Sequence, residues 1–222
     1  MAASNLREAN RVRLKDDVLT VLRDAIISGA FAPGERMNEK DLAEQLGTSR
    51  GPIRDSLSAL AHEGLVVHEA HKGAYVPLLD RHDIEDVYTL RISLETLAAR
   101  TAVHRASGSD FEALEQALTQ VAQAFDGGDR RALTDADLRF HDLFYAAAHH
   151  DRLNAAWRSV RSQVALCLFS RNTVSPTSRE IAVGEHARIL ELLREGSEAE
   201  LVDAVRSHIE TAYQRLIQSY TD

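Results

Sequence analysis

Past residue 80 the chain is a succession of long amphipathic runs in which apolar residues recur at helical spacing. Short breaks separate these runs, at residues 107–109, 127–128, 150–151, 175–176 and 196–197. A run of roughly 15 to 25 residues with a 3.6-residue apolar period predicts an α-helix that buries one face. Helices joined by such short connections pack as antiparallel neighbours. The pattern therefore predicts six helices in an all-helical bundle.

The first 80 residues follow a different pattern, with shorter apolar runs and three of the four prolines. The elements predicted there are a helix from Leu14 that Gly29 ends, a short helix over 39–46, a helix over 49–64, and two paired strands over 65–67 and 73–76. Helix, short helix, turn, helix and hairpin make a winged helix-turn-helix. We therefore expect a mainly α protein in two domains. Residues 1–78 form a winged helix-turn-helix whose first 11 residues are disordered, and residues 79–222 form the helical bundle.

Composition changes this picture little, but it excludes several classes of protein. The 222 residues are 44% hydrophobic and 27% charged, as is typical of a globular chain. Cys167 is the single cysteine, so no disulfide framework can form, which favours a reducing compartment. The longest purely apolar run, residues 164–169, is far too short to cross a bilayer, and the N-terminus lacks a secretory signal core. We therefore expect a cytoplasmic protein with no membrane partner.

The helix predicted over residues 49–64 has the features of a helix that reads DNA. Ser49 suits the N-cap position, and Pro52 falls in the first turn, where its missing N–H costs nothing. Arg50 and Arg54 share one face near the helix start, where amides and dipole favour phosphate and each guanidinium can pair with guanine. The alternative is that both arginines are solvated surface charges. The cap and the following wing favour DNA, although the formal net charge is -8.

This stretch resembles the DNA-binding domain of the GntR family of bacterial transcription regulators. The resemblance covers residues 12–78 and is carried by PGE at 33–35, LAEQLGTSRGPIRDSL at 42–57, EGLV at 63–66 and KGAYV at 72–76. It implies operator contacts from Lys40, Ser49, Arg50, Arg54, Lys72 and Gly73. Gly51, Asp55 and Lys72 stand where the family usually has Thr, Glu and often Arg, which leaves the operator preference open.

Four residues of types that bind metals are predicted to face one interior of the bundle. On the helix predicted over residues 130–149, Asp137 and His141 lie one turn apart on the inward face. His186 and His208 lie beside the apolar stripes of the last two predicted helices. Imidazole nitrogens and a carboxylate suit Zn, Ni, Co, Mn or Fe. The alternative is that each histidine is a hydrogen-bonded core residue, but all four together favour a divalent metal site.

The second half resembles the FCD domain, a helical ligand-binding domain found with this DNA-binding domain in the FadR-type branch of the family. The resemblance covers residues 82–218, on TLRISLETLAAR at 89–100, DLRFH at 137–141, EHARIL at 185–190 and HI at 208–209. In metal-binding members the ligands are an Asp and three His, which correspond to Asp137, His141, His186 and His208. The family also places an effector carboxylate near a first-helix arginine, here Arg91. The alternative for Arg91 is a salt bridge to Glu95 or Glu85.

Three functions remain open, and the first is favoured. A homodimeric regulator, most often a repressor in such families, reads an inverted repeat in double-stranded operator DNA and responds to a small carboxylic or sugar acid. A metal-dependent helical hydrolase would use His141 and Asp142, but Asp142 is predicted to face solvent and no general base or phosphate loop is recognisable. A constitutive DNA-binding protein with a structural metal would bind its operator whatever acid is added. We therefore expect a regulator and no enzyme.

Overall fold

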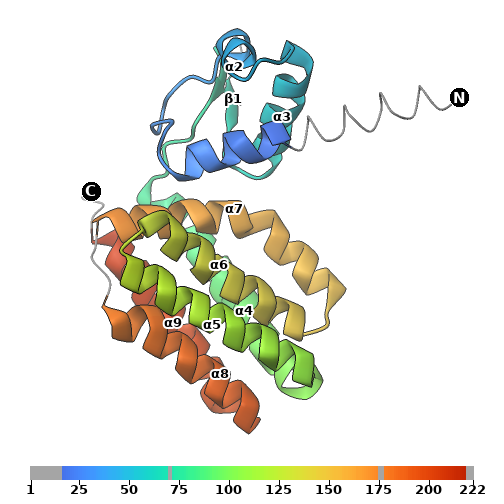
Figure 1. Cartoon of the computed structure of the whole chain (residues 1–222), viewed down its shortest axis with the longest axis vertical. Helices are drawn as coiled ribbons and strands as arrows, with labels where there is room; N and C mark the ends of the chain where they lie inside the picture. The colour runs from blue at the N-terminus through green and yellow to red at the C-terminus, as the bar shows by residue number, and fades with distance from the viewer. Residues whose placement is uncertain (1–16, 70–71, 175–177, 219–222) are drawn as a thin grey trace, which may run out of the picture. The chain divides into compact units, whose positions relative to one another are not determined.

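The computed structural model describes residues 17–69, 72–174 and 178–218. The chain divides into two compact units, Met1–Leu79 and Asp80–Asp222. The described residues are mainly α-helical, as the sequence predicts, with one two-stranded sheet in the first unit (Figure 1). Residues 1–11, for which disorder is predicted, lie outside the described residues.

The first unit is a winged helix-turn-helix. Residues 17–27 form a helix, and α2 (Glu39–Gln45), α3 (Arg50–His62), β1 (Val67–Glu69) and β2 (Gly73–Tyr75) follow. The apolar stripe of α3 holds it in the core, since Ile53, Leu57 and Leu60 have no exposed surface. The first strand begins two residues later than predicted. Leu65 and Val66 are buried core residues that precede it, and their apolar character extends the predicted strand too far towards the N-terminus.

A segment before α2 joins the wing, which the sequence does not predict. The backbone N–H of Gly34 donates to the carbonyl of Val76, and that of Met37 donates to the carbonyl of Ala74, each at 2.9 Å. Residues 34–37 lead directly into α2. These bonds therefore hold the wing at the start of α2.

In the described residues the second unit comprises six helices, in the predicted order. They are α4 (Arg81–Arg105), α5 (Gly108–Gly127), α6 (Arg130–Ala147), α7 (Asp151–Val174), α8 (Glu185–Glu195) and α9 (Glu198–Ile217), with a π-helical turn, η1 (Glu180–Gly184), before α8. Asp80 and Ser107 begin α4 and α5 with capping boxes, and the Asp129 side chain caps α6. Because α4 contacts α6, α7, α8 and α9, it is the central helix of the bundle.

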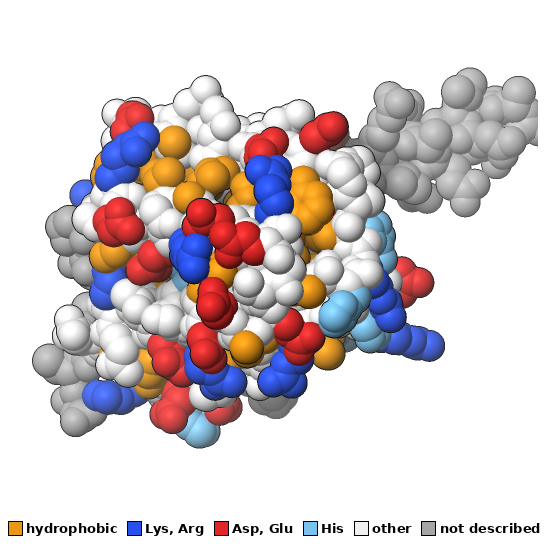
Figure 2. All heavy atoms as spheres, turned by 90° about the horizontal axis from the view of Figure 1, so that it is seen from below, with side chains coloured by type: hydrophobic (Ala, Val, Ile, Leu, Met, Phe, Trp, Pro, Cys, Tyr) orange, Lys and Arg blue, Asp and Glu red, His pale blue; other side chains and the backbone are white. Residues whose placement is uncertain are grey.

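One face of the molecule carries both acidic and basic side chains. Acidic and basic side chains alternate over the face shown in Figure 2, among small hydrophobic areas. Two large apolar side chains of α4, Leu90 and Leu97, are 45% and 44% exposed. None of the described helices is long and apolar enough to cross a membrane.

Candidate functional site

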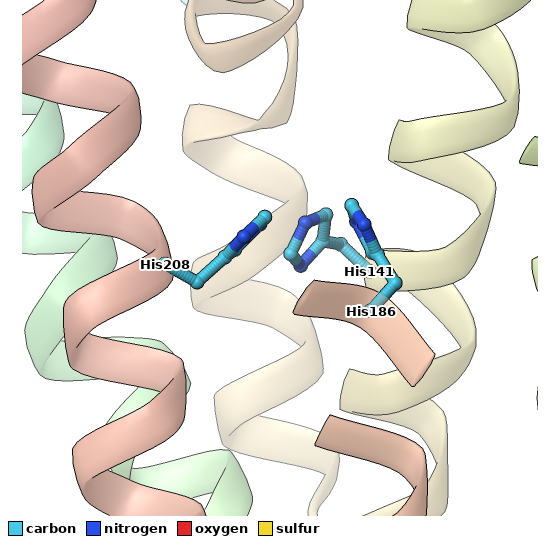
Figure 3. A group of neighbouring side chains, drawn as sticks. All are labelled: His141, His186 and His208. Carbon is cyan, nitrogen blue, oxygen red and sulfur yellow. The ribbon is translucent and has the colours of Figure 1, made fainter. Parts of the chain in front are cut away.

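Three histidines from three helices meet inside the bundle, with their rings turned towards one another (Figure 3). His141 comes from α6, His186 from the first turn of α8 and His208 from α9. All three are buried, and one ring nitrogen of each lies within 4.8 Å of those of the other two. Zinc ligands about 2.0–2.1 Å from one ion are about 3–4 Å apart, so the three ring nitrogens lie close to the separation that binding to one ion requires.

Asp137, one turn before His141 on α6, adds a carboxylate to this group. Its Oδ2 lies 3.6 Å from Nε2 of His141, and its Oδ1 lies 3.6 Å from Nε2 of His186. Asp137 Oδ2 and both Nε2 atoms have no hydrogen-bond partner among the described residues. Buried polar atoms are rarely left in that state. Since carboxylate oxygens and imidazole nitrogens are ligands of first-row divalent metals, the residues fit such an ion.

Each histidine ring also has an oxygen atom close to its Nδ1 atom. The oxygens nearest to Nδ1 are Glu95 Oε1 for His141 at 2.9 Å, the Ala182 carbonyl for His186 at 2.9 Å and Glu185 Oε2 for His208 at 2.6 Å. An Nδ1–H held in this way leaves Nε2 to bind a metal and raises its basicity. Ala182 lies in the π-helical turn η1, a feature that is frequent at functional sites.

The protonation states of these groups also suit a metal. Burial lowers the pKa of His186 well below its ordinary value, and burial also lowers the pKa of His208. Burial by itself would raise the pKa of Asp137, but His186, His141 and Arg171 hold that pKa below its ordinary value. At neutral pH the rings of His186 and His208 are therefore neutral and the carboxylate is ionised, which are the states that metal binding requires.

Arg91 on α4 lies next to Glu95, which in turn contacts His141. Arg91 is 1% exposed, and its Nε lies 3.3 Å from Glu95 Oε1. The two terminal nitrogens of its guanidinium have no hydrogen-bond partner among the described residues. Of the two partners that the sequence leaves open for Arg91, Glu95 is therefore its neighbour, while Glu85 is exposed. A free fork of N–H donors binds a carboxylate bidentately.

The charges of Arg91 and Glu95 are retained inside the protein. Burial by itself would lower the pKa of Arg91, but the carboxylates of Glu95 and Asp137 raise it. Burial would likewise raise the pKa of Glu95, yet Arg91 and His141 lower it to about 2. The pair is therefore ionised over the physiological pH range, and Glu95 serves both Arg91 and His141.

Sequence reasoning misses Arg171 on α7. Its side chain is buried, its Nη2 lies 4.0 Å from Asp137 Oδ1, and the same nitrogen donates to Asn172 Oδ1 at 3.0 Å. The sequence could have shown that Arg171 is buried, because it continues the helical spacing of the buried apolar residues at positions 164 and 168. A cation on such a buried face points to an anionic neighbour.

Asp142 does not lie on the solvent face as predicted. It is partly buried between α6 and α7, where its Oδ1 accepts from Trp157 Nε1 at 2.7 Å and its Oδ2 accepts from Arg161 Nη2 at 2.7 Å. The partners come from the next helix, and nothing local to residue 142 indicates them. Because both oxygens are engaged in joining two helices, Asp142 is not free to act with His141 in a hydrolase centre.

The residues predicted to bind DNA gather partly in one cleft of the first unit. The residues that line this cleft, of about 290 Å³, include three of them, Lys40, Arg50 and Gly73, as well as Arg36, His68 and the acidic Glu39. Gly73 has a φ of 100°, which favours glycine, and a Cβ there would meet the Arg36 guanidinium at 3.6 Å. Arg36 and His68 were not predicted. They precede α2 and follow α3, and only the pairing of residues 34–37 with the wing brings them together.

The other three predicted residues, Ser49, Arg54 and Lys72, do not line this cleft. Ser49 occupies the N-cap of α3, but its hydroxyl makes none of the predicted capping hydrogen bonds. Arg54 Nε lies 3.8 Å from Glu39 Oε2, and Lys72 pairs with Glu69, all on the surface. Exposed ion pairs contribute only about 0–1 kcal/mol, so both cations can exchange these acids for DNA at little cost.

A winged helix-turn-helix followed by a helical bundle is the architecture of a transcription regulator, and the relatives named below are regulators and not enzymes. The chain belongs to the GntR family. The model of bacterial regulatory proteins, gntR family, matches residues 14–76, and that of the FCD domain matches residues 86–211. GntR regulators bind operator DNA and effectors.

Known proteins are similar to this chain over most of their length. YdhC of Bacillus subtilis (strain 168), an HTH-type transcriptional regulator, is 28% identical over 85% of this chain and 82% of its own. The Nta operon transcriptional regulator of Aminobacter aminovorans is 29% identical over 86% of this chain and 89% of its own. The structure of Escherichia coli McbR/YncC has the same fold, with a TM-score of 0.82 at 22% identity over 94% of this chain and 99% of that one.

Proposed function

We propose that this protein is a cytoplasmic, homodimeric repressor whose affinity for operator DNA is set by a small carboxylic or sugar acid bound beside a divalent metal. One observation carries the proposal, a group of buried polar atoms without partners among the described residues. They are Asp137 Oδ2, Nε2 of His141 and His186, and both terminal nitrogens of Arg91. Each costs about 1–3 kcal/mol if it stays unpaired. A metal and a carboxylate would satisfy the whole group.

In this proposal Asp137, His141, His186 and His208 hold the metal, which is Zn, Ni, Mn, Co or Fe, since His and Asp ligands serve all of them. When bound, the ion supplies positive charge for oxygen atoms of the acid. Arg91 receives the carboxylate on its free fork, and Glu95 keeps both Arg91 and His141 in orientation.

Binding of the acid and the metal would affect DNA binding because these two ligands connect different helices of the bundle. Arg91 lies on α4, whereas the metal-binding residues lie on α6, α8 and α9. An acid held by both therefore favours one packing of these helices. α4 begins at Arg81, directly after the DNA-binding unit ends at Leu79. A coupling of about 1–3 kcal/mol would change operator affinity about 5- to 150-fold, which is sufficient for a switch.

The operator is contacted by Lys40, Ser49, Arg50, Arg54, Lys72 and Gly73, with α3 entering the major groove by its N-terminal end. Arg50→Ala is expected to weaken operator binding by about 1–3 kcal/mol and to reduce discrimination against a scrambled site. Fluorescence anisotropy with both DNAs measures this. Arg158→Ala, an exposed arginine of the second unit, removes the same charge and should leave both affinities unchanged.

The same anisotropy assay tests the switch. Small carboxylic and sugar acids are added one at a time to the metal-loaded wild type bound to operator DNA. At least one of these acids is expected to release the DNA. By linkage, operator DNA then weakens binding of that acid by the same factor. An operator affinity that no acid changes would instead mark a constitutive DNA-binding protein with a structural metal.

The homodimer is proposed to form through the exposed face of α4. Asp86, Leu90, Ser93, Leu97 and Arg100 recur every three or four residues and form one exposed stripe. Two copies of α4 running antiparallel about Ser93 bring Leu90 against Leu97 and Asp86 against Arg100. The stripe is therefore self-complementary in both apolar surface and charge, as a two-fold interface requires. In the part of the chain that the structure describes, Arg100 has no ion-pair partner.

Sedimentation velocity tests this interface. Leu90→Asp combined with Leu97→Asp is expected to produce a monomer, because four carboxylates would be buried together. Val21→Asp, at an apolar residue of similar exposure in the other unit, should stay dimeric. Arg100→Asp should weaken the dimer, and adding Asp86→Arg should restore it. A double aspartate variant that remains dimeric would exclude α4 as the interface.

A further inference from the structure

A cavity of about 180 Å³ lies in the second unit, where α5 and α7 end and α6 begins. Neither Arg91 nor any of the three clustered histidines lines it. One side is apolar and consists of Ala124, Phe125 and Leu133. The cavity is much larger than the about 30 Å³ that one water occupies. It is smaller than the about 300–1,000 Å³ of pockets for drug-sized molecules, so it suits a small organic ligand.

Arg130, at the start of α6, provides a positive charge at this cavity. It is exposed and forms no ion pair within the described part of the chain. Asp129 also lines the cavity, but its Oδ1 accepts from the backbone N–H groups of Arg131 and Ala132 at 2.8 and 3.2 Å. The first turn of α6 thus stabilises this negative charge. The Arg130 guanidinium is therefore available to a negatively charged ligand.

Asn172, near the end of α7, adds a buried hydrogen-bond donor to the lining. It is 7% exposed, its Oδ1 accepts from Arg171 Nη2 at 3.0 Å, and its Nδ2 donates to Thr134 Oγ1 at 3.1 Å. These two partners fix the orientation of the amide. An amide nitrogen carries two hydrogens, and Thr134 is the single acceptor that Nδ2 has among the described residues. The second N–H is therefore left for an acceptor in the cavity.

We propose that this cavity is a second ligand site, which binds the carboxylate of a short apolar acid. The two carboxylate oxygens accept from the Arg130 guanidinium and from the second N–H of Asn172, because an ionised carboxylate is purely an acceptor. The apolar chain of the acid lies against Ala124, Phe125 and Leu133. This side offers no partner for additional hydroxyl groups, whose burial would cost free energy. The ligand class is therefore a short aliphatic monocarboxylate.

Hydrogen bonds connect this second site with the proposed metal group, and the connection rests on the proposed function. The Nη2 atom of Arg171 that donates to Asn172 also lies 4.0 Å from Asp137 Oδ1. A carboxylate bound beside Asn172 partly offsets the positive charge of Arg171, which by itself opposes a metal cation at Asp137. The acid is therefore expected to strengthen metal binding, and by linkage the metal strengthens binding of the acid by the same factor.

Calorimetry with butanoate tests the site on the full chain carrying Arg91→Met and Glu95→Gln, which disables the other proposed acid site. Butanoate is expected to bind at least about tenfold more tightly than butanamide, which lacks the charge, or acetate, which lacks most of the apolar chain. Adding Arg130→Ala, or Ala124→Leu to fill the cavity, should weaken butanoate binding at least about tenfold. Arg152→Ala, at an exposed arginine outside the cavity, is the control and should leave the affinity unchanged.

Butanoate that does not bind, or that binds the two cavity variants as tightly as their parent, overturns the second site. The Zn²⁺ affinity of the parent, measured with and without saturating butanoate, tests the connection and is expected to increase about fivefold with the acid. An unchanged Zn²⁺ affinity overturns the connection. A wild type that binds no divalent metal contradicts the proposed function instead, and butanoate binding alone then decides whether the cavity is a site.

Discussion

His186→Ala is expected to weaken metal binding at least about 100-fold and to abolish the acid response, because it removes a buried ligand nitrogen from the centre of the group. The metal should raise the melting temperature of the wild type, since it binds only the folded chain, and this increase should disappear in the variant. Metal content by elemental analysis and thermal unfolding with and without the ion measure both effects.

The exposed His62→Ala, in the DNA-binding unit, is the matched control and should keep a full complement of metal. Operator binding without acid is also expected to survive in the His186 variant, because the DNA-reading elements form a separate compact unit. A wild type that contains no metal after any purification, and whose melting temperature no divalent ion changes, would reduce the histidine group to polar core packing.

Arg91→Met is expected to lower the free energy of unfolding by about 3–5 kcal/mol, because it leaves the Glu95 carboxylate buried beside no cation of comparable strength. The same variant should lose its response to acid while it retains the metal-binding residues. Denaturant unfolding and calorimetry with the metal-loaded protein measure the two effects separately.

Arg139→Met, at an exposed arginine on α6, is the control and should change stability by less than about 0.5 kcal/mol. Combining Arg91→Met with Glu95→Gln should recover a large part of the lost stability, because the uncompensated charge is removed, but acid binding should not return. A double variant that regains the acid response would show that the carboxylate is held elsewhere.

Helical periodicity predicts most of the inward-facing residues, because the period of 3.6 is a property of the local backbone, but it placed Asp142 wrongly on the solvent face. The inward placement of Asp137 and His141 follows from this rule, as does the buried stripe of α3. The helix boundaries follow from capping residues such as Asp80 and Ser107, which act on the amides of their own first turn. These features depend on residues close together along the chain.

The contacts between elements could not be predicted in this way. The pairing of Glu95 with His141, the engagement of Asp142 by Trp157 and Arg161, and the approach of Arg36 to Gly73 all join separate elements. The period identifies a buried face but not which helix covers it, nor how far along the axis the two faces are offset. What a polar residue on a buried face binds therefore depends on the atoms of the neighbouring helix that packs against it.

The amino-acid order alone therefore determined the two-part architecture, the helices, the inward direction of Asp137 and the three histidines, and the family resemblance. Packing of the helices decided that the histidine nitrogens converge within 4.8 Å and that the terminal nitrogens of Arg91 have no hydrogen-bond partner among the described residues. The physical reason is the distance along the chain over which each interaction acts. Backbone geometry and capping act over one or two turns, whereas the partner of a buried polar atom is set by which residues the core brings together across the bundle.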